Sequence, residues 1–189
     1  MPLFSLSEEG WFGPPSFTIH DENEDEVLCI ESDSYWHDDF AAYNPVSNSR
    51  VAYIQDTTAV CGPYAYEILS STKRICATLT HMLACCSESF ELDVHDEDKT
   101  RAYYFDRTSL LSREWSLSRH GEAVATYSTA WLGPWWGPSE IDIDDEYVGA
   151  RDKDFAAIIL FACVIIERIC HRKTQQQTHQ ANQAALGIP

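Results

Sequence analysis

Residues 155–166 read FAAIILFACVII, twelve consecutive apolar residues that end at the polar pair Glu167-Arg168. A helix on a protein surface keeps one polar face, and this stretch has none for about three turns. A helix that spans a membrane needs about 20 apolar residues, so twelve are too few. We therefore predict a hydrophobic helix that is surrounded on all sides by other parts of the same chain.

Charged residues at both ends of the stretch support the helix. Acidic residues before a helix and basic residues after it complement the dipole of its backbone. The acidic residues here are Asp152 and Asp154, and the basic ones are Arg168, His171, Arg172 and Lys173. These boundaries predict a helix over 153–172.

The sequence before the helix repeats with a period of about fifty residues. Aromatic residues at positions 17, 66 and 115 are each 49 residues apart, and the aliphatic residues at 19, 68 and 117 keep the same interval. In addition, VAYIQD at 51–56 resembles RAYYFD at 101–106, fifty residues later. Each repeated segment alternates apolar and polar residues, which is the pattern of a half-buried strand.

About ten to twelve short strands are expected from these segments and from the polar turns between them. A propeller typically needs about four to eight blades, and three repeats are too few. A closed antiparallel barrel fits better, because closure removes exposed edges and provides an interior for the helix. The predicted fold is therefore mainly β, a closed antiparallel barrel of about twelve strands that encloses one hydrophobic C-terminal helix.

The predicted domain organisation has three parts. Residues 1–15 form an N-terminal arm, residues 16–172 form the barrel with its central helix, and residues 173–189 form a flexible tail. The tail is rich in Gln and has no sustained apolar period, which favours disorder; a solvated extension of the helix is the alternative.

The composition is strongly acidic. The chain carries 30 acidic residues against 13 Lys and Arg, which gives a formal charge of −17. Such a charge argues against non-specific nucleic-acid binding and against unaided attachment to an anionic membrane. No secretory signal is visible in the first residues, and the seven cysteines are an odd number. We therefore expect free thiols and a cytoplasmic location, with peripheral attachment to membranes as an alternative.

Three segments resemble, in order, the opening hairpin, a later hairpin and the closing helix of the tubby C-terminal-like superfamily. They are FTIHDENEDEVLCI (17–30), EWSLSRHGEAVATYS (114–128) and DKDFAAIILFACVIIERI (152–169). The superfamily includes tubby proteins, the LURP-one-related proteins and the phospholipid scramblases. The resemblance covers about residues 16–172, and it implies a barrel of twelve strands filled by the closing helix.

By its length, and because it lacks the features that distinguish the other two branches, the chain is most similar to a LURP-one-related protein. That branch has no established catalytic activity. The resemblance thus implies a non-enzymatic binding or regulatory module, which recognises a lipid head group or a protein partner on the outer barrel surface. The scramblase branch is the alternative, and it implies a calcium-responsive, membrane-associated protein. The chain also lacks the sequence motifs of common hydrolases and nucleotide-binding enzymes, so no catalytic residue and no organic cofactor is predicted.

Calcium is the one metal that the sequence suggests. In scramblases the closing helix follows an acidic calcium-binding segment, and Asp152 and Asp154 stand near the matching position. The acidic turn at 21–26 resembles a calcium loop but lacks the required Gly and the final Glu. A weaker site would combine that turn with Asp142, Asp144 and Asp145. An exposed acidic turn without metal is the simpler interpretation.

Two further segments are candidates for contact with a lipid or a partner. Trp131, Trp135 and Trp136 lie between Gly-Pro turns and would form an apolar binding lip, or else plug one end of the barrel. Tubby proteins bind phosphoinositides through clustered Lys and Arg, whereas the basic residues here are scattered, with Lys73 and Arg74 in one turn.

Cys85 and Cys86 occupy a place similar to the palmitoylated stretch of scramblases, which implies acylation. Ordinary buried or loop thiols are the alternative. A zinc site that includes His81 lacks the usual ligand spacing.

Overall fold

A computed structural model of the 189-residue chain describes residues 3–9, 15–32, 39–59, 62–83, 88–96, 99–108, 113–129, 138–148 and 153–185. These residues form twelve strands and two helices. The strands are β1 (Leu3–Glu9), β2 (Ser16–His20), β3 (Glu26–Ser32), β4 (Phe40–Tyr43), β5 (Arg50–Asp56), β6 (Ala65–Ser70), β7 (Ile75–Leu83), β8 (Glu88–His95), β9 (Thr100–Arg107), β10 (Glu114–Arg119), β11 (Glu122–Ser128) and β12 (Ser139–Ile143). The helices are α1 (Asp145–Val148) and α2 (Lys153–Ala185).

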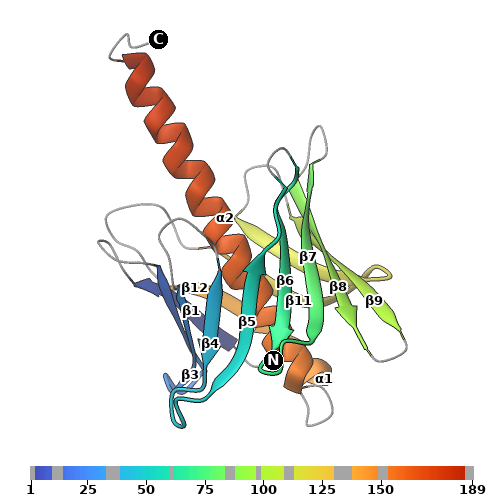
Figure 1. The fold of residues 1–189 in the computed structure, drawn as a ribbon. Coiled ribbons are helices and arrows are strands. Elements are labelled where there is room, and N and C mark those ends of the chain that lie inside the picture. The colour runs from blue at the N-terminus through green and yellow to red at the C-terminus, as the bar shows by residue number, and fades with distance from the viewer. Residues whose placement is uncertain are drawn as a thin grey trace.

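The twelve strands close into one barrel, in which each strand pairs with its sequence neighbours in antiparallel fashion (Figure 1). The closure is made by β1, which pairs with β12 on one side and with β2 on the other. The predicted mainly-β fold, a closed antiparallel barrel of about twelve strands with a C-terminal helix, is confirmed.

The 49-residue spacing corresponds to a unit of four strands. The repeated aromatic residues Phe17, Tyr66 and Trp115 lie on β2, β6 and β10, and all three are buried in the core. In each unit the strand pairing shifts its register at the same place, directly after Ile19, Ile68 and Leu117. Three four-strand units therefore make up the barrel.

The third unit takes its fourth strand from the other end of the chain. That strand is β1, which lies within the segment 1–15 that the sequence assigned to an arm. The side chains of Leu6 and Phe4 face the core, but the next position on the same face is Glu8. Because a charged residue interrupts the apolar alternation, the sequence pattern does not reveal the strand.

The second similarity, at a spacing of fifty residues, does not match equivalent positions. In β5 the buried residues are Ala52 and Ile54, whereas in β9 they are Tyr103 and Phe105. A shift by one residue exchanges the two faces of a strand. VAYIQD and RAYYFD therefore resemble each other in letters but differ by one position in the inward register.

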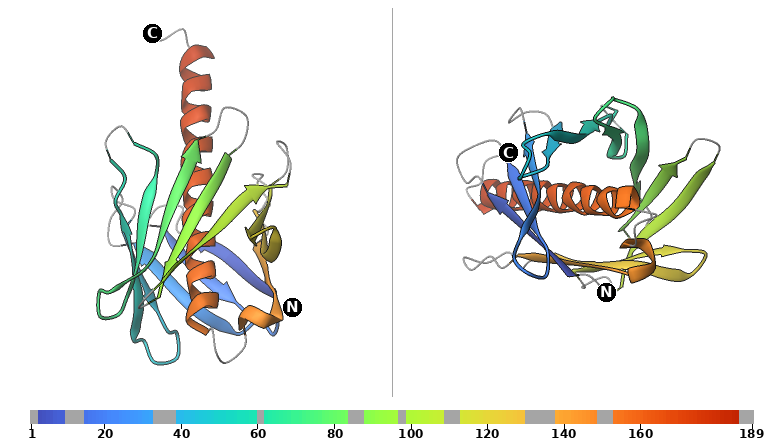
Figure 2. Two further views of the ribbon diagram at one scale, coloured as in Figure 1. Left: turned by 90° about the vertical axis from the view of Figure 1, so that its right-hand side faces the viewer. Right: turned by 90° about the horizontal axis from the view of Figure 1, so that it is seen from below.

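The apolar run of α2 belongs to the same core as the inward side chains of the strands. Ile159, Ala162, Cys163, Val164, Ile165 and Ile166 all have 0% exposure, and they form one cluster with the buried strand residues. Figure 2 shows α2 passing between the strands, with its C-terminal part extending beyond them.

The helix continues past the predicted end at residue 172, and 173–185 is helical rather than a disordered tail. Gln and Ala are good helix formers, and extending a helix that is already fixed by packing is much easier than starting one. None of the helices in the described ranges has an apolar stretch long enough to cross a membrane.

Candidate functional site

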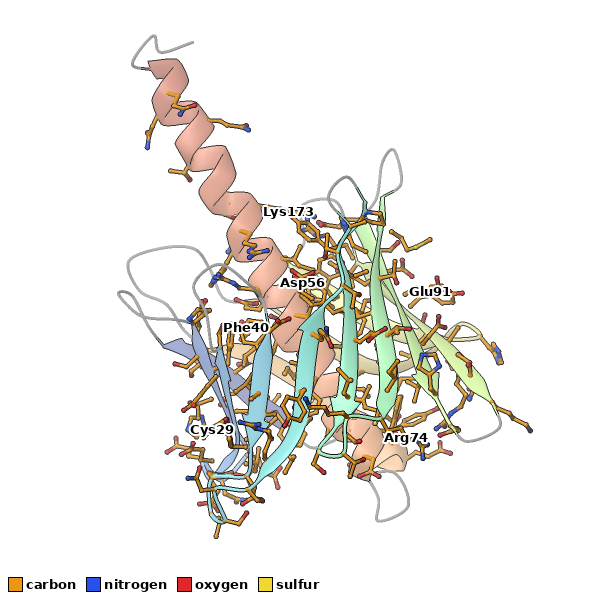
Figure 3. All side chains as sticks on the ribbon, in the orientation of Figure 1. Cys29, Phe40, Asp56, Arg74, Glu91 and Lys173 are labelled. Carbon is orange, nitrogen blue, oxygen red and sulfur yellow. The ribbon has the colours of Figure 1, made fainter. Side chains whose placement is uncertain are left out.

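The barrel has two ends with different chemistry. Because the strands alternate in direction, the hairpin turns β2–β3, β4–β5, β6–β7 and β8–β9 all lie at the end where α2 begins, which we call the base. The helix leaves the barrel at the opposite end, the mouth. In Figure 3 Arg74 lies at the base and Lys173 at the mouth.

Two turns at the base share one backbone geometry. Glu24 in the β2–β3 turn and Lys73 in the β6–β7 turn both have a positive φ, 65° and 62°. The N–H of each donates to the carbonyl of the first turn residue, Asp21 (3.0 Å) or Ser70 (2.9 Å). The repeat thus places a basic turn where the preceding unit has an acidic one.

Lys73 and Arg50 converge on one tyrosine. The Arg50 guanidinium donates hydrogen bonds to the hydroxyls of Tyr53 (2.7 Å) and Tyr43 (2.9 Å). It also lies over both rings, 4.8 Å and 5.3 Å from their centroids. The Lys73 ammonium is 5.6 Å from the centroid of the Tyr53 ring. We call these four residues the Tyr53 site.

Within the described ranges, the Tyr53 site holds its two cations without carboxylate partners. An arginine is charged at every accessible pH, and hydrogen bonds to Tyr43 and Tyr53 raise the pKa of Arg50 further. Among the residues that the structure describes, neither Arg50 nor Lys73 has an ion pair with an acidic side chain, although the chain carries 30 acidic residues. The three donors of the Lys73 ammonium and part of the Arg50 guanidinium therefore remain available to an anion.

The structure describes one of the two segments that the sequence offers for contact with a lipid or a partner. Lys73 and Arg74 lie in a turn at the base. Ser128 and Ser139, which end β11 and begin β12, lie at the mouth. The segment between them contains Trp131, Trp135 and Trp136, and it lies outside the described residues. The prediction of an apolar lip there remains a prediction.

Cys85 and Cys86 also lie outside the described residues, so acylation remains a prediction. Of the seven cysteines, four are described, and none of those four forms a disulfide bond. Burial raises the pKa of the Cys170 thiol to about 12 and that of Cys163 well above its usual value. Both thiols are therefore protonated and unreactive at neutral pH.

The proposed calcium ligands do not form a cluster in the part of the chain that is described. No group of three His, Cys, Asp or Glu side chains that could hold a metal ion occurs there, and Asp152 lies outside it. Asp144 directly precedes the helix α1, where its carboxylate accepts the N–H of Glu146 (3.0 Å). Asp142, Asp145 and Asp154 also lie at the base, but together with Asp144 they do not form a group that could hold a metal ion. Calcium binding remains a prediction.

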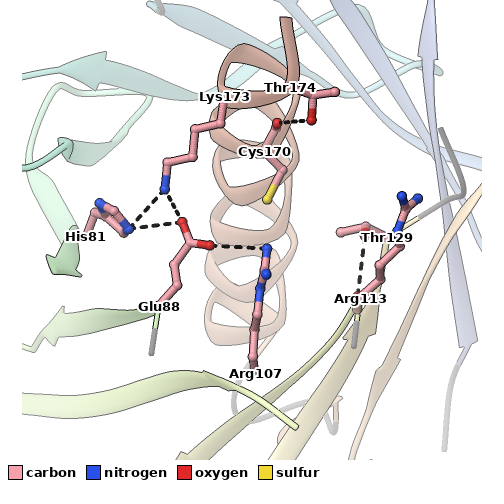
Figure 4. Close-up of polar contacts among 8 residues, drawn as sticks. All are labelled: His81, Glu88, Arg107, Arg113, Thr129, Cys170, Lys173 and Thr174. Atoms are coloured by element: carbon pink, nitrogen blue, oxygen red, sulfur yellow. Dashed lines mark hydrogen bonds and ion pairs between the residues drawn. The ribbon is translucent and has the colours of Figure 1, made fainter. Parts of the chain in front are cut away.

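At the mouth, the carboxylate of Glu88 connects the barrel strands to α2 (Figure 4). Glu88 contacts the Lys173 ammonium of α2, the His81 Nε2 atom of β7 (3.1 Å) and the Arg107 guanidinium of β9 (3.1 Å). Burial alone would raise the pKa of Glu88, but these hydrogen bonds and charges lower it to about 2. We call these four residues the Glu88 cluster.

A second group, the His171 cluster, holds α2 from the side of β1. The His171 ring contacts the Glu8 carboxylate of β1 through Nδ1 and lies 3.4 Å from the Glu167 carboxylate through Nε2. Arg168 is 4.0 Å from Glu8. Tyr127 of β11 donates a hydrogen bond to Glu167. Burial raises the pKa of Glu167, although the hydrogen bond from Tyr127 and the charge of His171 oppose the rise.

Sequence reasoning did not predict either cluster. Their wall residues occupy inward positions of strands: Glu8 follows Leu6, Glu88 precedes Phe90, and Arg107 follows Phe105. A charged residue in phase with the buried face of a strand is the signal that was available.

No protein-family model, no curated protein and no solved structure matches this chain. The fold and the site define a class of architecture. That class is a closed barrel of twelve antiparallel strands with a C-terminal helix and a cationic aromatic site at its base.

Proposed function

We propose that this protein is a non-enzymatic, cytoplasmic binding and regulatory module of the LURP-one-related type, which recognises a phosphate-bearing lipid head group on its outer surface. The observation that carries this proposal is the Tyr53 site. Two cations lie on one aromatic ring, with no carboxylate partner among the described residues, in a chain whose formal charge is −17.

The proposal includes a structural role for α2. We propose that the barrel encloses its apolar run completely, so that the helix takes the place of an interior ligand. The burial of residues such as Ile159 and Ile165, both at 0% exposure, supports this role. A ligand would then be bound on the outside, where the Tyr53 site lies.

Phosphate is the anion that suits this arrangement. An arginine that is oriented by two hydroxyls presents fixed donors, and a lysine beside it adds a mobile positive charge. Because the molecule carries a net negative charge, it does not attract an anion from a distance. Recognition of a phosphate group therefore depends on the nearby cations of the Tyr53 site, and salt should weaken it. In the adjacent β4–β5 turn, Val46 is 93% exposed and would touch the bilayer surface.

Co-sedimentation with vesicles tests the proposal. Neutral phosphatidylcholine vesicles are compared with vesicles that also contain phosphatidylserine or a phosphoinositide, at low and high salt. We expect binding to the anionic vesicles only, and Arg50→Gln or Lys73→Gln should weaken it about tenfold, because a charge-assisted hydrogen bond contributes about 1.5–3 kcal/mol.

Lys99→Gln is the matched control. Lys99 lies in the β8–β9 turn at the same end of the barrel, and the change removes the same charge away from the Tyr53 site. Equal weakening by Lys73→Gln and Lys99→Gln would indicate general charge attraction and contradict the site. No binding to any vesicle would reject the lipid ligand and favour a protein partner.

The calcium-responsive, scramblase-like alternative has no supporting contact among the described residues. Its decisive residues, Asp152, Cys85 and Cys86, lie outside them. Calcium-dependent lipid mixing in proteoliposomes would favour it over the binding module.

A further inference from the structure

His171 connects the helix to the strand that closes the barrel. Its ring lies between the carboxylate of Glu8 on β1 and the carboxylate of Glu167 on α2. The His171 and Glu167 side chains are only 11% and 6% exposed, and that of Glu8 is 20% exposed. The contact is therefore largely shielded from solvent, where charge interactions are strong.

We propose that His171 is a pH-controlled latch, which holds β1 against α2 while its imidazole is protonated and loosens β1 when the proton is lost. This inference is independent of the proposed lipid site, because the latch lies at the mouth and the Tyr53 site lies at the base.

The charges around His171 explain the latch. β1 contributes Glu8, and α2 contributes Glu167 and Arg168. β11 contributes the neutral hydroxyl of Tyr127 and β12 that of Ser139, both hydrogen-bonded to Glu167. Among the described residues, the carboxyl groups of Glu8 and Glu167 face the protonated imidazole and the Arg168 guanidinium. Loss of the imidazole proton leaves the two carboxyl groups with Arg168 alone in a partly dry site, which is unfavourable.

β1 is the element that responds, because little else fixes it from inside. Among the β1 residues whose burial is described, Leu6 alone is buried and Phe4 is half-buried, whereas β6 and β10 each bury an aromatic and an aliphatic residue. A strand with a small apolar face depends more on its polar contacts. Loosening of β1 would open the barrel between β12 and β2.

The direction of the pH effect follows from the pKa of His171. Burial alone would lower this pKa, but the hydrogen bond and charge of Glu8, together with the charge of Glu167, raise it above its usual value. A raised histidine pKa stabilises the folded contact below the unfolded value of about 6.5, and this stabilisation is lost as the pH rises through the folded value.

Hydrogen exchange of the full chain tests the latch. Exchange of the β1 amides, corrected for intrinsic rates, is compared at about pH 6, below the ordinary imidazole pKa of about 6.5, and at about pH 8.5, well above it. In the wild type we expect β1 to lose protection at the higher pH relative to β6–β9, on the order of tenfold for each unit by which the pKa is raised.

Three variants separate the latch from other effects. His171→Gln removes the charge at every pH and should leave β1 poorly protected at both values. Glu8→Gln removes the wall partner and should flatten the pH response without changing the helix. His20→Gln is the control, because His20 pairs with Ser5 of β1 but lies outside the cluster; it should keep the wild-type response. Unchanged β1 protection across pH in the wild type, or a full pH response in His171→Gln, would overturn the proposal.

Discussion

Tyr127 of β11 donates its phenolic hydrogen to Glu167, the one acidic residue of α2 that is buried. Burial raises the pKa values of both groups, and each is the other's neighbour in the core. The end of the apolar run is thus not the end of the buried helix. The barrel wall supplies the hydrogen bond that allows a carboxyl group to lie there.

Removal of this hydroxyl should destabilise the fold. Tyr127→Phe removes one of the donors that the buried Glu167 carboxyl group uses, and we expect a loss of about 1–3 kcal/mol in the free energy of unfolding, measured by urea denaturation. Tyr104→Phe is the control, because Tyr104 donates to Glu91 on the exposed outer face. Equal losses in the two variants would show that burial does not strengthen the Tyr127 contact.

The Glu88 cluster should set the acid limit of stability. The folded pKa of Glu88 is about 2, below its usual value. Its stabilisation is therefore complete above about pH 4.5 and is lost as the pH falls towards 2.

We expect Glu88→Gln to lower the free energy of unfolding at neutral pH by roughly 1–2 kcal/mol, a figure reduced for partial exposure to solvent. The variant should also have a flatter melting curve against pH on the acid side. Thermal melting of Glu88→Gln at several pH values checks this, with the exposed outer-face variant Glu31→Gln as the control. If the melting temperatures of wild type and Glu88→Gln fell in parallel as the pH is lowered, the prediction would be contradicted.

A charge in the apolar run should unfold the domain. Leu160→Asp or Ile165→Asp would leave an unpaired charge in the core. This should lower the free energy of unfolding by several kcal/mol, out of a total of about 5–15 kcal/mol. Far-UV circular dichroism against temperature measures this, with the exposed position Thr178→Asp as the control. Unchanged melting of the two core variants would show that the barrel does not enclose the helix.

The outer part of α2 should be dispensable for the barrel. A proline inside a helix is unfavourable by about 3 kcal/mol. Gln180→Pro changes an exposed position beyond the barrel, so helical signal should fall while the melting temperature stays the same. Ala162→Pro, in the buried part, should abolish folding. A large drop in the melting temperature of Gln180→Pro would show that the outer helix contacts the barrel.

The sequence allowed the barrel to be predicted because its inward residues repeat. Phe17, Tyr66 and Trp115 occupy equivalent buried positions in the three units. Such a regular spacing can be recognised in the sequence before the strand pairing is known. β1 was not predicted because its face alternates only twice before Glu8. The extent of α2 was not predicted because Gln residues fit a helix and a disordered tail equally well.

The candidate site was predictable only in part. Lys73 is recognisable as a basic turn residue, but its relation to Arg50 depends on the pairing of β5 with β6. Arg50 lies 23 positions earlier in the sequence, with no motif between them. The mouth clusters depend on contacts between residues as distant as Glu8 and His171, which no local pattern encodes.

The split third unit has a consequence for the order of folding. During synthesis β1 is made first, but its partner β12 and the helix that contacts Glu8 are made last. The cylinder therefore cannot close until β12 has left the ribosome. Until β12 and α2 have followed, the earlier strands lack the apolar residues that share their core, and their own apolar faces stay open to wrong partners.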